Sequence, residues 1–242
     1  MLKTRGFIIR KIPYGDNSAI LKIYTEEEGL LTFMAHGMQR KKGGNAPLSQ
    51  LMNFVELVYY PSGANSEIHR LKEIQPVHGF AGIQQNPVKI QVLLFSAELL
   101  NHLLQERAPD PELFSLLNTF YDSLNREDVF VHQPLWFLLQ LMKNQGLAPH
   151  LNMDEQWAGF SPETGSMIPK DTLLPHEKFL SLEGSRLAKE LLQTQADNIK
   201  SISSKAEVRH ETLDSMALFC EMHLLHGKKL RSIEIIREVL RS

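Results

Sequence analysis

The residues best suited to chemistry form a basic run, Arg40-Lys41-Lys42, in the middle of residues 34–44. Strand-like residues lead into the run, and two glycines close the stretch. Three consecutive cations on a loop between strands can bind a polyanion such as nucleic acid. A solvated hairpin loop, whose charge serves only solubility, explains the same residues equally well. The choice between the two interpretations depends on the charge distribution and the secondary structure around the run.

Other reactive side chains are few. His223 and His226 are three residues apart in a helix-like stretch, a spacing that can hold a metal, but no carboxylate stands at a matching step. The single cysteine, Cys220, excludes an internal disulfide and lies in an apolar helical run, so we expect a buried, unreactive thiol. Residues 26–28, all Glu, are expected to be a solvated turn. Because the common phosphate-binding and hydrolase motifs are missing, we expect no enzyme, no bound metal and no cofactor.

The charge distribution favours the first third of the chain as a polyanion site. The net charge is −2, which argues against a strongly basic nucleic-acid binder. Residues 1–80, however, hold ten Lys/Arg against seven Asp/Glu, whereas the remainder holds sixteen against twenty-one. Apolar residues make up 43% of the chain, as in a soluble globular protein. The sequence has neither a signal-peptide pattern nor an apolar run of about 20 residues, so we expect a cytoplasmic protein without membrane contact.

Five short strands are predicted in the first 75 residues. They are rich in β-branched and aromatic residues, are separated by turn signals, and cover residues 6–12, 19–25, 30–35, 54–60 and 67–74. This number and length match a five-stranded oligonucleotide-binding (OB) barrel, which holds single strands in a basic groove and stacks bases on aromatic rings. We expect about a third of six aromatic residues at such a surface, and the rest in the core: Phe7, Tyr14, Tyr24, Phe33, Tyr59 and Tyr60.

From residue 87 onward the pattern is helical. Apolar residues at three- and four-residue steps predict helices at 88–106, 110–124, 134–145, 185–195, 205–225 and 232–240. Asp110 followed by Pro111 is a typical helix start. A loop-rich insert at 147–180 contains four prolines. The sequence thus predicts an α+β protein of two domains: an OB barrel in residues 1–80 and an all-helical domain in residues 81–242.

Several stretches carry a family resemblance. In order, they are TRGFIIR at 4–10, YGDNS at 14–18, YTE at 24–26 before Gly29-Leu30, the basic run after Gly37, Gln50-Leu51, and LRSIEIIREVL at 230–240. Their order and spacing resemble RecO, the family of bacterial DNA repair and recombination mediators. The resemblance implies an N-terminal OB barrel and a C-terminal helical domain, which is the division that the residue patterns also predict.

The resemblance also implies a function without bond-breaking chemistry. Family members bind single- and double-stranded DNA, anneal complementary strands, and bind the C-terminal tail of single-stranded-DNA-binding protein. With RecR, and in some settings RecF, they help to load RecA onto coated single strands, so the protein would work at the nucleoid. Many members carry a four-cysteine zinc module in the segment matching residues 146–165. That segment has no cysteine here, so we expect no zinc module and instead packing by Trp157, Phe160 and Met167.

The expected DNA contacts are cations that neutralise phosphates, so affinity should fall steeply with salt. Backbone-directed binding without base readout suits annealing, which must be indifferent to sequence. The main candidates, followed by three weaker ones, are Arg10, Lys11, Arg40, Lys41 and Lys42, then Lys3, Arg5 and Lys22.

Two alternatives remain open from the sequence. In the first, the protein is an interaction adaptor whose helical domain binds the acidic, phenylalanine-ended tail of single-stranded-DNA-binding protein, with DNA contact secondary. That tail needs an apolar pocket rimmed by cations, for which the candidates are Arg126, Lys143, Lys189 and Arg209. In the second, the protein is a translation or RNA-processing factor with an OB barrel.

Overall fold

The computed structural model describes residues 1–36, 50–63, 67–77, 81–128, 131–154, 156–172 and 179–239. The basic run at residues 40–42 therefore lies outside the described residues. The chain forms two compact units. Unit 1 comprises Met1–Ala81 and Ser96–Phe114, and unit 2 comprises Gly82–Phe95 and Ser115–Ser242. Unit 1 thus includes residues 96–114, which the sequence analysis placed in the second domain.

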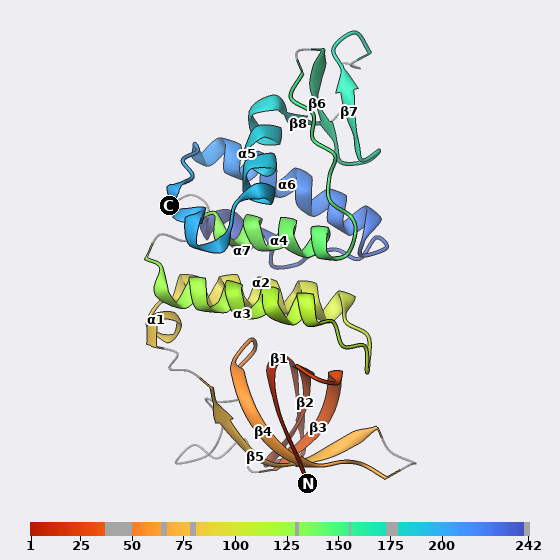
Figure 1. Ribbon diagram of the computed structural model, residues 1–242, viewed down its shortest axis with the longest axis vertical. Helices are drawn as coiled ribbons and strands as arrows, with labels where there is room; N and C mark the ends of the chain where they lie inside the picture. The colour runs from red at the N-terminus through yellow and green to blue at the C-terminus, as the bar shows by residue number, and fades with distance from the viewer. Residues whose placement is uncertain are drawn as a thin grey trace. The chain divides into compact units, whose positions relative to one another are not determined.

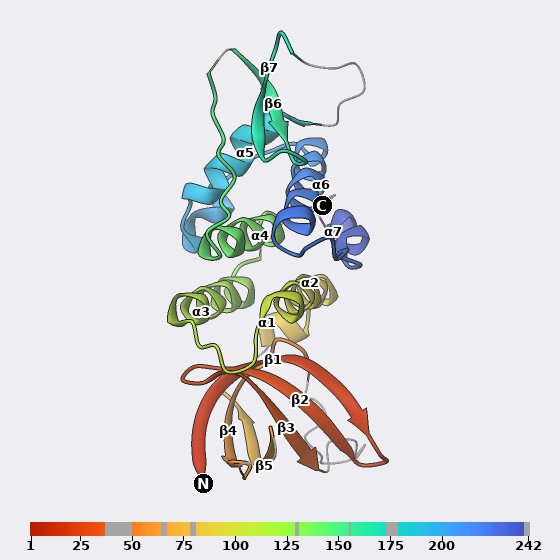
Figure 2. The ribbon, with the colours of Figure 1, turned by 90° about the vertical axis from the view of Figure 1, so that its right-hand side faces the viewer.

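The strands β1 to β5 of unit 1 form a closed barrel (Figures 1 and 2). Going round the barrel, the order is β1-β2-β3-β5-β4, with β3 and β5 parallel and all other neighbours antiparallel. This confirms the predicted five-stranded barrel. The strands are β1 (Leu2–Tyr14), β2 (Ser18–Thr25), β3 (Gly29–His36), β4 (Phe54–Tyr60) and β5 (Ile68–Pro76).

The first strand, β1, serves two neighbours. Its residues Leu2 to Phe7 pair with β4, and Gly6 to Tyr14 pair with β2. The register shifts between Ile8 and Arg10, which marks a bulge. Because a bulge bends a strand and increases its twist, one long strand can pass from one wall of the barrel to the next. The cations after the bulge therefore lie beside β2 rather than β4.

The barrel interior is filled by the alternate side chains of each strand. Leu21, Ile23, Phe33, Leu57 and Tyr59 are at most 1% exposed. Most of the six aromatic residues named above were expected in the core, and this is confirmed. Four are buried and two are exposed, namely Tyr14 and Tyr60.

Unit 1 also contains a strap, residues 104–110, which connects α2 (Pro87–Leu103) to α3 (Pro111–Arg126). A short helix, α1 (Ala81–Gln84), precedes α2. As predicted, Asp110 caps α3, because its Oδ1 accepts the backbone N–H of Leu113 at 2.9 Å. One turn later Phe114 packs against Phe7 and Phe54, with ring centroids 5.7 and 6.1 Å away. These contacts tie residues 96–114 to the barrel.

Four helices of unit 2 agree with the predicted pattern within a few residues, and the short 3-10 helix η2 (Ala196–Ser201) was not predicted. The four are α4 (Gln133–Asn144), α5 (Leu182–Gln193), α6 (Ala206–His223) and α7 (Ile233–Val239). Helices α4, α5 and α6 pack on one another, and α7 packs on α6. Cys220 on α6 is buried as expected, and burial raises the pKa of its thiol to about 12. Within the described ranges, every helix is too short or too polar to cross a bilayer.

The prediction of an all-helical second domain needs correction. The insert expected to be loop-rich contains a sheet of order β7-β6-β8, made of β6 (Trp157–Ser161), β7 (Ser166–Pro169) and β8 (Leu180–Ser181). Strands of two to five residues are too short to show a period of two in the sequence. Of the expected anchors, Phe160 is buried and packs edge-on against Phe219 at 5.5 Å. Trp157 and Met167 are only half-buried.

Candidate nucleic-acid interface

Two predicted DNA contacts, Arg10 and Lys22, are brought together on the outside of the barrel. They are direct partners across the β1–β2 ladder. Both neighbours of Lys22 along β2, Leu21 and Ile23, belong to the barrel core, so Lys22 points outward. Across the next ladder, Lys22 is paired with Thr32 of β3. Two cations thus share one row on the outer surface.

The next row on this surface adds a cation, Arg70, that is not among the predicted contacts. Met34 of β3 pairs with Arg70 of β5, and Arg70 pairs with Tyr60 of β4. Arg70 and Tyr60 are exposed, Tyr60 by 42%. Only the parallel β3–β5 pairing places Arg70 here, and no local sequence pattern indicates which strands will pair. We define the candidate face by five outward residues of the barrel: Arg10, Lys22, Thr32, Met34 and Arg70.

The described part of β3 ends on the same side of the barrel. The last residue of β3, His36, pairs with Ser18 at the start of β2, and the Ser18 hydroxyl lies 2.9 Å from His36 Nδ1. Ser18 is four residues from Lys22 along β2, or about 13 Å at the rise of a strand. His36, the last residue described before the basic run, is therefore about 13 Å along the sheet from the row of Arg10 and Lys22.

The remaining predicted contacts on β1 have different surroundings. Lys3 lies 2.9 Å from Glu56, and Arg5 lies 2.7 Å from Glu26. The hydrogen bond from Lys3 holds the pKa of Glu56 below its usual value. Both cations belong to the part of β1 that pairs with β4, so they stand before the bulge and Arg10 after it. Lys11 is half-buried and is paired with Leu21.

The three glutamates of the acidic turn at residues 26–28 bind other side chains of the barrel, whereas the sequence predicted a solvated turn. Glu26 binds Arg5, Glu27 accepts a hydrogen bond from the Thr4 hydroxyl, and Glu28 accepts one from the Tyr59 hydroxyl at 2.5 Å. Burial, reinforced by Glu28, raises the pKa of Tyr59. Each carboxylate therefore serves the barrel itself.

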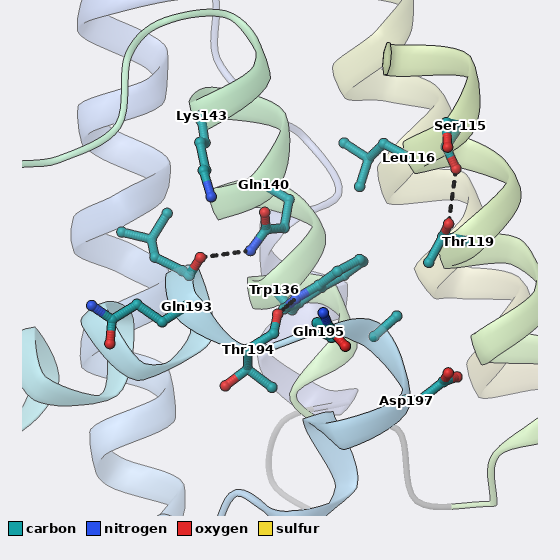
Figure 3. Close-up of a pocket in the computed structure, with 12 residues that line it drawn as sticks. Ser115, Leu116, Thr119, Trp136, Gln140, Lys143, Gln193, Thr194, Gln195 and Asp197 are labelled. Atoms are coloured by element: carbon teal, nitrogen blue, oxygen red, sulfur yellow. Dashed lines mark hydrogen bonds between the residues drawn. The ribbon is translucent and has the colours of Figure 1, made fainter. Parts of the chain in front are cut away.

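Unit 2 contains a separate pocket of about 530 Å³ (Figure 3). Its apolar lining comes from Leu116, Trp136, Leu192 and Ala196, and Lys143 contributes a cation. Three hydrogen bonds fix its walls. Trp136 Nε1 donates to the carbonyl of Thr194 at 2.9 Å, and Gln140 Nε2 donates to the carbonyls of residues 191 and 192 at 3.1 Å. The volume suits a short peptide end or a small ligand.

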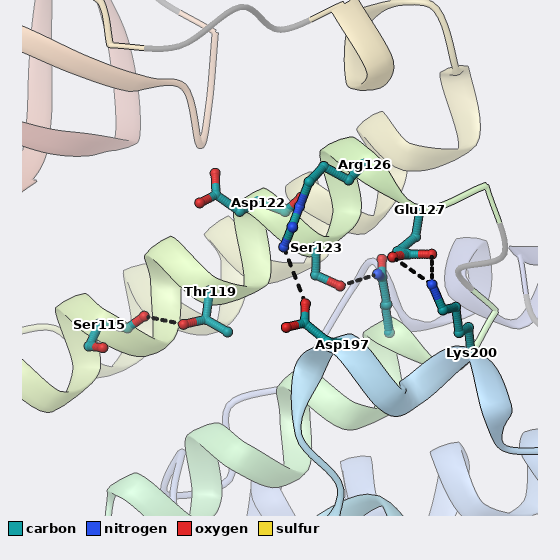
Figure 4. A network of polar contacts seen from close by, with 9 residues as sticks. Ser115, Thr119, Asp122, Ser123, Arg126, Glu127, Asp197 and Lys200 are labelled. Carbon is teal, nitrogen blue, oxygen red and sulfur yellow. Dashed lines mark hydrogen bonds and ion pairs between the residues drawn. The ribbon is translucent and has the colours of Figure 1, made fainter.

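The four cations considered for a partner-binding rim are not equivalent. Lys143 lines this pocket, and Arg126 pairs with the pocket residue Asp197 at 3.2 Å, as Figure 4 shows. Arg209 is buried and donates to the carbonyl of Ser204 at 2.6 Å, so it serves the interior of unit 2 instead. Lys189 is half-buried and does not line the pocket.

One of the two histidines considered for a metal has a different role. His223 Nε2 lies 3.1 Å from the carbonyl oxygen of Pro162, and its ring packs 4.8 Å from that of Phe219. The contact with Pro162 connects α6 to the hairpin of β6 and β7, whereas Phe219 lies on α6 itself. His223 thus has a structural use.

Comparisons with known proteins place the chain in the class of DNA repair and recombination proteins. Residues 1–80 match the family model described as Recombination protein O N terminal, and residues 84–232 match Recombination protein O C terminal. The chain belongs to the RecO family.

The relatives are similar over nearly their whole length. DNA repair protein RecO of Christiangramia forsetii is 26% identical, with 99% of each chain covered. The protein of the same name from Exiguobacterium sibiricum is 27% identical, covering 98% of this chain and 97% of its own. That of Salinibacter ruber is 26% identical over 87% of this chain and 84% of its own. The family supports a role in DNA repair and recombination, which confirms the resemblance read from the sequence.

Proposed function

We propose that this protein is a recombination mediator that acts by binding and breaks no covalent bond. It binds single- and double-stranded DNA through the barrel and anneals complementary strands. With RecR, and with RecF where required, it helps RecA to load onto DNA coated by single-stranded-DNA-binding protein. Its place of action would be the cytoplasm, at the nucleoid.

The observation that carries this proposal is the row of Arg10, Lys22 and Thr32 on the outside of the barrel. We interpret the barrel as an OB fold, and its strand order β1-β2-β3-β5-β4 supports that interpretation. OB folds bind oligonucleotides on the face of their second and third strands, where Lys22 and Thr32 lie. Contacts of cations with phosphates carry no base readout, as annealing requires.

The proposal is tested by replacing the basic run. The variant Arg40, Lys41, Lys42→Ala is compared with the native protein by fluorescence anisotropy of a labelled single strand over a range of salt concentrations. Each lost phosphate contact should reduce the slope of log affinity against log salt by about 0.7. An unchanged affinity and salt slope would show that the basic run does not contact DNA. The same titration with RNA tests the alternative of an RNA-processing factor, which requires RNA to bind more tightly than DNA.

A second candidate function rests on the pocket of unit 2. We propose that this pocket binds the acidic, phenylalanine-ended tail of single-stranded-DNA-binding protein. The ring would enter between Leu116 and Trp136, and Lys143 would pair with a carboxylate of the tail. Lys143→Ala should weaken binding of a tail peptide about tenfold, whereas Lys170→Ala, a change at an exposed lysine of the same unit, should not. Equal affinity of all three proteins for the peptide would argue against this pocket.

A further inference from the structure

A carboxylate, Glu106, lies on the candidate face. Its Oε1 accepts a hydrogen bond from Nζ of Lys22 at 2.6 Å and is 3.4 Å from the hydroxyl of Thr32. Glu106 belongs to the strap, so it is 84 residues from Lys22 in sequence but within the same unit. The carboxylate therefore occupies the position at which a DNA phosphate would meet Lys22.

The main chain holds Glu106 in place. Glu106 forms a parallel bridge with Leu30 of β3, and the backbone N–H of Arg107 donates to the carbonyl of Leu30 at 3.1 Å. Further along, the Tyr24 hydroxyl lies 3.2 Å from the carbonyl oxygen and 3.0 Å from the backbone nitrogen of Asp110. The strap is thus fixed to β3 at Glu106 and Arg107, and to β2 at Asp110. The backbone contacts of the strap, and not only the rotamer of the Glu106 side chain, therefore place Glu106 beside Lys22.

We propose that Glu106 competes with DNA phosphate for Lys22 and thereby limits the affinity of the barrel for DNA. This inference rests on the proposed DNA binding by the candidate face. A carboxylate and a phosphate both offer anionic oxygens to an ammonium group, so they exclude each other at one lysine. A mediator that must release DNA after annealing or loading gains from a built-in competitor of this kind.

The exposure of the pair suits an exchange of partners. The side chains of Lys22 and Glu106 are 31% and 45% exposed. Ion pairs this open to water are weak, so a phosphate can displace the carboxylate at small cost. The same weakness bounds the effect of removing the carboxylate, since the energies measured for exposed pairs correspond to a gain in DNA affinity of about two- to fivefold.

The test is a double-mutant cycle in the full-length protein. Native protein, Glu106→Gln, Lys22→Ala and the double variant are titrated into a labelled single strand by fluorescence anisotropy at several salt concentrations. Glu112→Gln removes the same charge from an exposed position in unit 1 and serves as the matched control. Thermal unfolding of each variant verifies that it is folded.

We expect Glu106→Gln to bind two- to fivefold more tightly, with a salt slope steeper by about 0.7, the value for one additional phosphate contact. In the Lys22→Ala background the same change should have no effect, and Glu112→Gln should match the native protein. An equal gain in both backgrounds, or no gain in either, would overturn the competition. The variant Arg10→Ala distinguishes this outcome from failure of the proposed function. If the barrel does not bind DNA, Arg10→Ala binds DNA as the native protein does. If only the competition fails, Arg10→Ala still weakens DNA binding.

Discussion

Arg10 and Lys22 face each other across the β1–β2 ladder, on the outer surface of the barrel. Like charges placed directly opposite each other are unfavourable in a sheet, so a pair of this kind calls for a counterion. Glu106 supplies one for Lys22, at 2.6 Å. No carboxylate among the described residues pairs with Arg10, so the two cations of the row differ before DNA binds.

This difference predicts unequal effects of removing the two cations. Arg10→Ala should lower the affinity for a single strand more than Lys22→Ala, because the charge of Lys22 is already offset by Glu106. We expect a loss of about tenfold for Arg10→Ala and less than about threefold for Lys22→Ala, measured by anisotropy at low salt. A larger loss from Lys22→Ala than from Arg10→Ala would contradict the assignment of Glu106 as its partner.

The close approach of the strap to the barrel predicts a stability effect at Gly29. Gly29 and Gly15 both have positive φ, +71° and +58°, so alanine is strained at either position. A Cβ at Gly29 would also lie 2.5 Å from the carbonyl carbon of Ala108, whereas a Cβ at Gly15 meets no atom within 4 Å. Gly29→Ala should therefore lower the free energy of unfolding by about 2 kcal/mol more than Gly15→Ala. Urea unfolding measures this difference. Equal losses of unfolding free energy in the two variants would mean that the strap can move away from residue 29 without destabilising the protein.

A buried histidine predicts a pH dependence of stability. His132 is 4% exposed, and burial, with a smaller effect of the Arg209 charge, lowers its pKa to about 4. In the unfolded chain the pKa is near its ordinary value of about 6.5. Between these values the unfolded state binds more protons, so the free energy of unfolding falls as the pH falls from 6.5 toward 4.

The corresponding measurement compares urea unfolding at pH 7 and pH 5. His132 should account for about 2 kcal/mol of the loss in the native protein, and His132→Gln should lack that part. His150→Gln, a change at an exposed histidine of unit 2, should keep the native pH dependence. If His132→Gln lost as much stability as the native protein, the titration would belong to other groups.

Much of the barrel follows from local sequence signals. Each of its five strands was predicted within a few residues, because β-branched and aromatic runs bounded by Gly, Pro and Asn are local features. The cap at Asp110 was likewise predicted, since a capping residue before Pro111 needs only neighbouring residues. The small sheet of unit 2 was missed because its strands are very short and β8 reaches β6 from about 20 residues away.

The candidate site was predictable only in part. Charge and composition indicated Arg10 and Lys22 separately, but their pairing depends on the register of two strands. Arg70 depends on the parallel pairing of β3 with β5, which no local pattern reveals. Glu106 lay in a stretch expected to be helical, and its contact with Lys22 spans 84 residues. Long-range contacts of this kind are set by the packing of the whole unit.

The central claim, that the outer face of the barrel binds DNA, is tested most directly by two charge-matched triple variants. One removes Arg10, Lys22 and Arg70, the three cations of the candidate face. The other removes three exposed cations of unit 2, Lys170, Arg186 and Lys228. Anisotropy titrations of a single strand at several salt concentrations should give the barrel variant an affinity at least about tenfold lower and a salt slope smaller by about 1.4, with the unit 2 variant within about twofold of native. Native-like binding by the barrel variant, or an equal loss in the unit 2 variant, would contradict the account.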